Sequence, residues 1–166
     1  MNDTTPDQQD TSLEAMQSIL EAQKKAYLAE GEVSYATRYD RLERAINVVR
    51  KNEKRFVEAM TADFGHRSEH QSLFTDIASS VTPLRHAQKH MKQWMRREKR
   101  KLTPALLGLF GAKAWIDYQP LGVVGVISPW NFPVNLTFAP LSGILSAGNR
   151  CMIKPSEYTP VTSAAM

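Results

Sequence analysis

Cysteine is nearly absent from this sequence of 166 residues, which contains Cys151 alone. One cysteine excludes an internal disulfide framework and CxxC metal sites, and it favours a reducing compartment, so we expect a cytoplasmic protein. The sequence also lacks GxGxxG, a glycine pattern that commonly marks a dinucleotide-binding turn. Long apolar runs are missing too, because none reaches the roughly 18 uncharged residues of a membrane-spanning helix. We therefore expect no membrane span, and the polar start does not resemble a signal peptide.

The composition that remains is typical of a globular protein. Hydrophobic residues make up 42% and charged residues 23%, and the length suits one domain. The net charge of +4 is modest, and much of the positive charge lies in residues 92–101. These cations surround Trp94 and could indicate nucleic-acid binding, but Lys and Arg near a helix end usually form a solvated face. No recognised binding module surrounds the segment, so we expect no nucleic-acid partner.

The histidines and the cysteine give little support for a metal site. His66 with His70, and His86 with His90, are spaced so that each pair could bind zinc from one helix face. No carboxylate-and-histidine signature accompanies them, so we interpret them as solvated helix residues and expect no metal. Cys151 lies in the apolar segment RCMIK, where we expect a small and inert core residue.

Helical periodicity dominates the first hundred residues. Thr11 is expected to cap a helix over residues 12–30. A second periodic run covers residues 34–63, and a glycine ends it. A third run covers residues 68–99, and Pro83 should kink or divide that helix.

The hydrophobic period changes near residue 114. "GVVGVIS" and "RCMIK" are short apolar runs that predict two buried strands, and "AWIDYQ" predicts another strand before them. Residues 136–147 can form a helix between the two buried strands, so the order predicts a parallel strand–helix–strand crossover. Thr159 should cap a last helix that begins at Pro160.

The expected fold class is α/β, with N-terminal helices followed by the start of a Rossmann-like parallel sheet. Two parallel strands are too few for a doubly wound sheet, so we expect a domain that is incomplete at the C-terminus. The predicted segments are a polar leader at 1–11, a helical part at 12–100, a connecting segment at 101–113 and a truncated βαβ part at 114–166.

Two polar clusters follow the two buried strands. The first is "SPWNFP", which contains Asn131, and the second runs from Lys154 to Glu157. Ligands of open parallel sheets bind at the carboxyl ends of the strands, where both clusters lie. Pro129 and Pro133 stiffen the first turn, so the Asn131 carboxamide could stabilise a developing oxyanion. Lys154 and Glu157 could bind ribose hydroxyls beside it.

Each cluster also has a purely structural interpretation. Asn131 could cap the following helix while Trp130 fills the core. Lys154 and Glu157 could be a solvated surface pair. The spacing of these residues does not decide between the alternatives.

A family resemblance adds to this reading. "PLGVVGVISPWNFP" followed by "LSAGNRCMIKPSEYTP" resembles the aldehyde dehydrogenase superfamily in two motifs at the family's spacing. The upstream segments "RYDRLERAINVVRKNEKRFVEAMTADFGHRSEHQS" and "HMKQWMRREKR" are also similar to this superfamily, and most to its coniferyl aldehyde dehydrogenase branch. Together the similar segments cover residues 13–166.

The resemblance implies roles for particular residues. Asn131 would supply the side-chain amide of the oxyanion hole. Lys154 and Glu157 would contact the adenosine ribose of NAD or NADP, since the lysine also tolerates a 2′-phosphate. The residues that would line the dinucleotide site beside them are Ile127, Ser128, Pro129 and Trp130.

The resemblance also implies an activity, which is NAD(P)-dependent oxidation of a small aldehyde, coniferyl-type aromatic aldehydes included. The full-length protein would be a homodimer, with the segment around "AWIDYQP" leading to a small bridging β-structure. The family's nucleophilic cysteine and its basic glutamate have no counterpart in this sequence, so the chain alone should be inactive. The alternative is a stand-alone nucleotide-binding or helical interaction module without catalysis.

Overall fold

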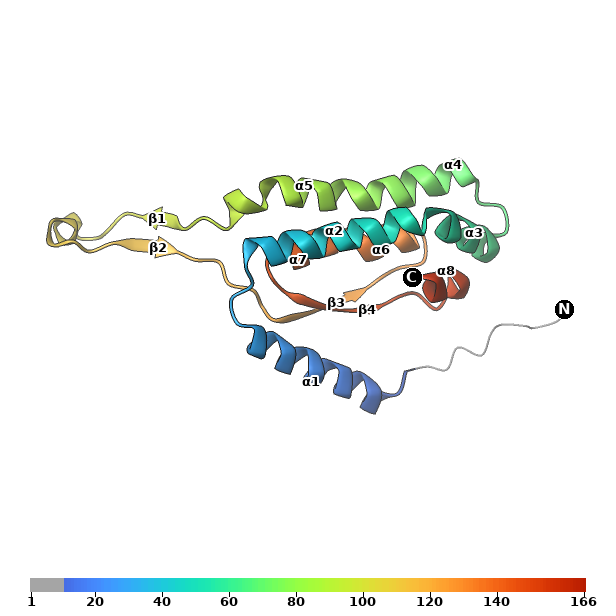
Figure 1. The fold of residues 1–166 in the computed structure, drawn as a ribbon, viewed down its shortest axis with the longest axis horizontal. Coiled ribbons are helices and arrows are strands. Elements are labelled where there is room, and N and C mark those ends of the chain that lie inside the picture. Colours follow the sequence, from blue (N-terminus) through green and yellow to red (C-terminus); the bar gives the residue numbers. More distant parts are fainter. Residues whose placement is uncertain (1–10) are drawn as a thin grey trace.

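The computed structural model describes residues 11–166, so nearly all of the predicted leader lies outside the described residues. Figure 1 shows a small sheet with helices on both of its faces and a narrow arm that projects from one end. The elements in chain order are α1 (Leu13–Glu30), α2 (Tyr35–Lys51), α3 (Glu53–Phe64), α4 (Glu69–Ser72), the π-helix η1 (Leu73–Ala78), α5 (Ser79–Trp94), β1 (Glu98–Arg100), the 3₁₀-helix η2 (Ala105–Phe110), β2 (Ala114–Ile116), β3 (Val123–Ile127), α6 (Pro133–Phe138), α7 (Leu141–Ser146), β4 (Arg150–Lys154) and α8 (Pro160–Ala165).

The first helix begins one residue later than the predicted cap implied. Ser12, not Thr11, is the N-cap of α1, because its hydroxyl accepts a hydrogen bond from the Ala15 N–H at 3.2 Å. Both residue types cap helices well, so the sequence alone could not choose between them. The helix ends at Gly31, whose φ of 67° is a conformation that glycine adopts without strain.

The second periodic run is two helices rather than one. Asn52 separates α2 from α3, with φ −108° and ψ 13° instead of helical values. Its side-chain Nδ2 donates to the Val48 carbonyl at 2.8 Å, which satisfies a carbonyl at the end of α2. An apolar pattern that continues on both sides of such a turn looks like one helix in the sequence.

The third run is also more irregular than predicted, but not at the proline. Pro83 lies inside α5, and the irregular turn is η1, which immediately precedes that helix. Within this stretch hydroxyls donate to the carbonyl four residues back, as Thr82 does to Ala78 at 2.9 Å, and such bonds bend helices. The helix ends at Trp94, so the predicted helical end near residue 99 is wrong and strand β1 stands there instead.

The predicted parallel crossover is confirmed. β3 and β4 pair in parallel, from Val123 opposite Arg150 to Ile127 opposite Lys154. The single helix expected between them is divided into α6 and α7. α7 packs on one face of the sheet and α1 on the other (Figure 1).

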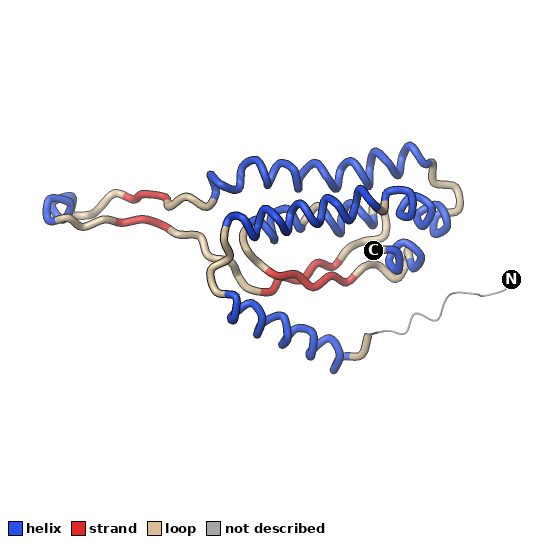
Figure 2. Tube along the Cα trace, in the orientation of Figure 1, coloured by secondary structure: helices blue, strands red, loops and turns tan. Residues whose placement is uncertain are grey.

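The strands are less buried than predicted. Ile127 is 83% exposed, whereas Val126 is 7% exposed. Within residues 11–166, β3 and β4 pair only with each other, as the red segments in Figure 2 show. Each strand therefore has one edge without a neighbouring strand among these residues.

The main core lies between the helices, and α2, α3, α5, α6 and α7 all contribute to it. Its fully buried apolar side chains are Leu42, Ile46, Val49, Phe56, Met60, Leu84, Met91 and Val134. This core fixes the position of α6, the helix that follows the Asn131 turn.

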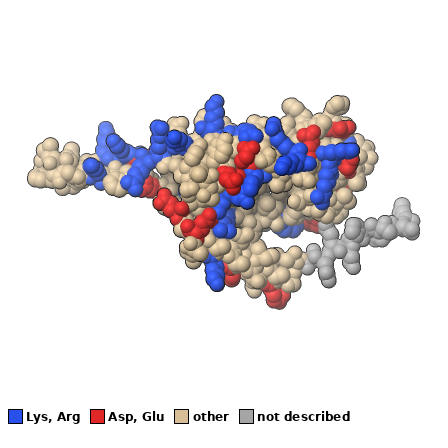
Figure 3. Space-filling model, viewed as in Figure 1, with Lys and Arg blue, Asp and Glu red and all other residues tan. Residues whose placement is uncertain are grey.

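The predicted connecting segment forms the tip of the arm. β1 and β2 pair antiparallel and carry η2 away from the body (Figure 1). Basic side chains gather along the arm and at its junction with α5 (Figure 3). Among the helices described, none combines the length and the apolar character needed to cross a bilayer.

Candidate functional site

The turn that follows β3 presents most of its side chains to solvent. Ile127, Pro129 and Trp130 are exposed, and Trp130 retains 51% of its accessible surface. The interpretation of Trp130 as a core residue is therefore wrong. Ser128 differs, since it is 4% exposed and its hydroxyl accepts a hydrogen bond from Thr137 Oγ1 at 2.7 Å. Of the four residues expected to line a dinucleotide site, Ser128 alone points its side chain into the protein.

Asn131 does not cap the helix that follows it. The N-cap of α6 is Phe132, which makes no side-chain capping bond. The free N–H groups of Val134 and Asn135 both donate to Asp76 Oδ1, at 3.1 Å each. A carboxylate from η1 thus performs the capping, so the Asn131 side chain has no structural task at this helix end.

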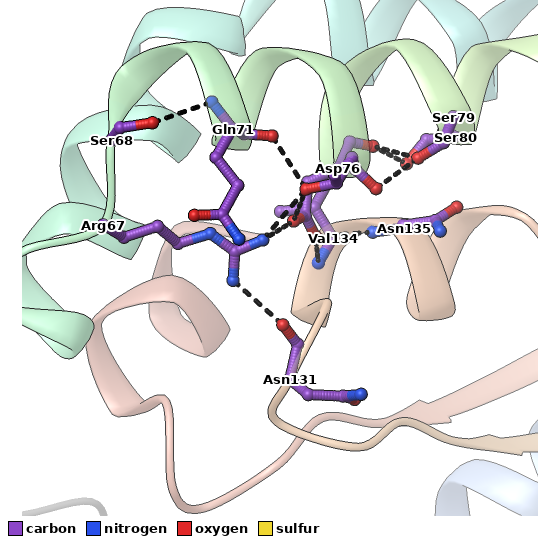
Figure 4. Close-up of polar contacts among 10 residues, drawn as sticks. Arg67, Ser68, Gln71, Asp76, Ser79, Ser80, Asn131, Val134 and Asn135 are labelled. Carbon is purple, nitrogen blue, oxygen red and sulfur yellow. Dashed lines mark hydrogen bonds and ion pairs between the residues drawn. The ribbon is translucent and has the colours of Figure 1, made fainter.

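Arg67 joins the same carboxylate to the Asn131 turn (Figure 4). Its Nη2 forms an ion pair with Asp76 Oδ2, and its Nη1 donates to the main-chain carbonyl of Asn131 at 2.9 Å. The guanidinium lies over the rings of Phe64 and Phe132, with 4.8 and 5.4 Å to the ring centroids. In Figure 4 the Asn131 side chain points away from Arg67. We call Arg67 and Asp76 the clamp.

Both charges of the clamp are buried, with Arg67 9% and Asp76 0% exposed. Burial raises the pKa of Asp76, while the N–H of Asn135, the charge of Arg67 and the N–H of Val134 act in the opposite direction. Burying two charges costs free energy that their attraction repays only with good geometry and further hydrogen bonds. The hydrogen bonds to the turn supply part of this compensation, while the buried Nε of Arg67 has no hydrogen-bond partner among the described residues. Removing one partner of the pair would leave the other charge buried and unpaired.

No sequence pattern indicated the clamp. Arg67 is 64 residues before Asn131, and Asp76 is 58 residues before Val134. Arg67 stands in a loop and Asp76 in a π-turn, so no periodic pattern marks either as a partner of the later turn. Only the packing of the N-terminal helices on α6 brings them there.

The second predicted cluster lies at the same edge of the sheet. Ile127 is opposite Lys154 in the parallel register, and the Ser128 N–H donates to the Lys154 carbonyl at 3.0 Å. Lys154 and Glu157 form an ion pair with side chains 59% and 63% exposed. The hydrogen bond from Lys154 lowers the pKa of Glu157. The pair is solvated, as the structural alternative states, and it is also accessible to a ligand.

The helix after β4 is capped in the same manner as α6. Thr159 was the predicted cap, but its buried Oγ1 has no hydrogen-bond partner. The N–H groups of Val161 and Thr162 donate instead to the Asp63 carboxylate, at 3.0 and 2.7 Å. Asp63 belongs to α3, so the helical part of the chain caps both helices that follow a strand of the parallel sheet.

The cysteine and the histidines, the other residues considered for chemistry, do not contribute to the carboxyl edge of β3 and β4. Burial raises the pKa of the Cys151 thiol to about 11, and its Sγ contacts the Met152 carbonyl at 3.6 Å. The rings of His86 and His90 lie next to each other on α5, with centroids 4.3 Å apart and planes tilted by 34°. The described part of the chain contains no group of three or more His, Cys, Asp or Glu side chains arranged to hold a metal ion.

The family of the chain follows from comparison with known proteins. Residues 2–166 match the aldehyde dehydrogenase family, and the chain belongs to that family. It is 54% identical over 148 residues to a probable coniferyl aldehyde dehydrogenase of Caulobacter vibrioides, which covers 89% of this chain and 30% of that protein. It is 48% identical over 154 residues to a coniferyl aldehyde dehydrogenase of a Pseudomonas species, covering 92% of this chain and 31% of the relative.

Solved structures agree with this assignment. The substrate-bound Staphylococcus aureus AldH superposes with a TM-score of 0.82 at 26% identity, over 90% of this chain and 32% of that one. The predicted family and the predicted mixed helix-and-strand fold are therefore confirmed. The chain spans about a third of the length of the relatives that it matches.

Proposed function

We propose that this chain forms the cofactor-facing edge and supplies the oxyanion donor of an NAD(P)-dependent aldehyde dehydrogenase. The observation that supports the proposal best is the common position of the two clusters. Asn131 follows β3 and Lys154 ends β4, and the parallel register aligns the carboxyl ends of these strands. Ligands of such sheets bind outside this edge.

The residues of the edge suit a dinucleotide. Ile127, Pro129 and Trp130 offer exposed apolar surface, and the Lys154–Glu157 pair offers a donor and an acceptor for ribose hydroxyls. Ser128 would take part through its main chain, since its hydroxyl is already bonded to Thr137. When bound, NAD(P)⁺ supplies the acceptor for the hydride of the aldehyde.

Either cofactor is compatible with the charge of Lys154, which can also face a 2′-phosphate. Among relatives of the same fold, one PnpE structure contains nicotinamide adenine dinucleotide, and a succinic semialdehyde dehydrogenase of Streptococcus pyogenes contains NADP⁺. We therefore leave the choice between NAD and NADP to a binding measurement on this protein.

Asn131 would act electrostatically. Its carboxamide is free of structural duties and can donate to the oxygen of an aldehyde that gains negative charge as a nucleophile adds to the carbonyl. One such donor is worth about 3 to 4 kcal/mol in the transition state. Cys151 is not the nucleophile, because half-burial and a pKa of about 11 keep it a neutral thiol. The nucleophilic cysteine and the basic glutamate would lie in the part of the enzyme outside residues 1–166.

The finer properties rest on the relatives. Coniferyl-type aromatic aldehydes are the proposed substrates, because the relatives at 54% and 48% identity carry that name. We also propose a homodimer, and a cytoplasmic location in keeping with the unpaired cysteine.

The test uses a complete enzyme, in which this chain replaces the matching third of the Caulobacter vibrioides relative. Asn131→Ala should lower kcat for an aromatic aldehyde about 100- to 1,000-fold and leave KM for NAD(P)⁺ within about twofold. Asn52→Ala is the matched control, since it removes an asparagine amide between α2 and α3 and should keep kcat. The rate of NAD(P)H formation measures kcat for both variants. An Asn131→Ala variant with the kcat of the unmodified enzyme would contradict the proposal.

A further inference from the structure

We propose that Arg67 and Asp76 are positioning residues, which hold the Asn131 carboxamide in the direction that the reaction requires. The inference rests on the proposed role of Asn131. It assigns a function to the clamp, whose two members lie in a different part of the chain from the turn that they hold.

The prolines of the turn do not fix Asn131 by themselves. Pro129 and Pro133 lock their own φ angles, and each restricts the residue before it, which are Ser128 and Phe132. Asn131 is neither a proline nor the residue before one. Its backbone therefore needs another restraint if its side chain is to keep one direction.

Arg67 provides that restraint. Its Nη1 donates to the Asn131 carbonyl at 2.9 Å, and this bond fixes the peptide group on one side of the Asn131 Cα. The side chain leaves the same Cα on the side away from Arg67 (Figure 4). Holding the carbonyl thus limits the directions available to the carboxamide, while the carboxamide itself stays free for a ligand.

Asp76 holds the other end of the turn and orients Arg67. Its Oδ1 accepts the first free N–H groups of α6, and its Oδ2 is paired with Arg67. The rings of Phe64 and Phe132 lie beside the guanidinium, so Arg67 has little freedom to take another geometry. A hydrogen-bonded charge pair in a buried site is both strong and rigid, unlike a pair at the surface.

The position of Asp76 in η1 fits this role. π-Turns inside α-helices are rare and occur frequently at functional sites. Here the π-turn brings the Asp76 carboxylate to the start of α6, where its Oδ1 accepts the N–H groups of Val134 and Asn135.

The experiment is a double-mutant cycle in the complete enzyme. Arg67→Met should lower kcat about 10- to 100-fold, the effect of a misplaced catalytic group, with KM for NAD(P)⁺ nearly unchanged. In an Asn131→Ala background the same substitution should lower kcat no further, because no carboxamide is left to position. Arg67→Lys, which keeps a donor and the charge, and Asp76→Asn should lie between the unmodified enzyme and Arg67→Met.

Arg41→Met is the matched control. Arg41 is also a largely buried arginine in an ion pair, with Glu30, but it lies away from the turn. The Arg41→Met substitution should lower the stability of the enzyme without lowering kcat. If instead the losses of Arg67→Met and Asn131→Ala multiply in the double variant, the clamp acts independently of the Asn131 carboxamide and the inference is overturned.

Two further results separate this inference from the proposed function. A normal kcat for Asn131→Ala overturns both, whereas a damaged Asn131→Ala with a normal Arg67→Met overturns only the clamp. A crystal structure of the Arg67→Lys variant tests the inference without an activity measurement, because it shows the orientation of the Asn131 side chain. We expect the Asn131 side chain in more than one orientation, and one unchanged orientation would count against the clamp.

Discussion

At the scale of single residues, carboxylates from the N-terminal helices decide how the two strand-to-helix turns are held. Asp76 accepts two N–H groups of α6, and Asp63 accepts two of α8. A local Ser, Thr or Asn commonly does this work. Because the capping comes from elsewhere in the chain, Asn131 and the residues near Lys154 are free to face a ligand.

The state of Cys151 is testable at the same scale. With a pKa of about 11, roughly 1% of the thiol is ionised at pH 9, so alkylation by iodoacetamide should be slow in the native protein. In urea the rate should rise to that of an ordinary cysteine. Mass spectrometry of the peptide that contains Cys151 measures both rates. Equal rates in buffer and in urea would show that the thiol is exposed, and the assignment of Cys151 as a core residue would fail.

At the scale of elements, the sequence predicted the features that hydrophobic periodicity and glycine positions indicate. It predicted the two parallel strands, the helix end before Gly65 and the crossover between the strands. It did not predict the break at Asn52 or strand β1, because apolar or charged patterns continue across both positions. The clamp could not be predicted from the sequence, because partners about sixty residues apart come together only through tertiary packing.

The attachment of α8 also belongs to this scale. Asp63→Ala removes the acceptor of the Val161 and Thr162 N–H groups, which should cost about 1 to 2 kcal/mol locally. Amide hydrogens of residues 161–166 should then exchange about 5- to 30-fold faster in the complete enzyme. Hydrogen-exchange mass spectrometry measures this rate. Glu69→Ala, at the start of α4, should leave it unchanged, and unchanged exchange in Asp63→Ala would refute the capping role.

At the scale of the whole molecule, the chain is a sheet edge supported by helices. α1 and α7 lie on opposite faces of β3 and β4, and the clamp links the outer helices to the turn at the carboxyl end of β3 (Figures 1 and 4). The family match covers the helices and the strands together, and the chain spans about a third of each relative. We therefore regard the helical part as a support for the site.

The most direct test of this account is a crystal structure of the complete enzyme with bound NAD(P)⁺. We expect the cofactor along the carboxyl ends of β3 and β4, with the adenosine ribose at Lys154 and Glu157 and the nicotinamide toward Asn131. A cofactor bound elsewhere, with these residues in solvent, would contradict the proposal that this edge is the site of aldehyde oxidation.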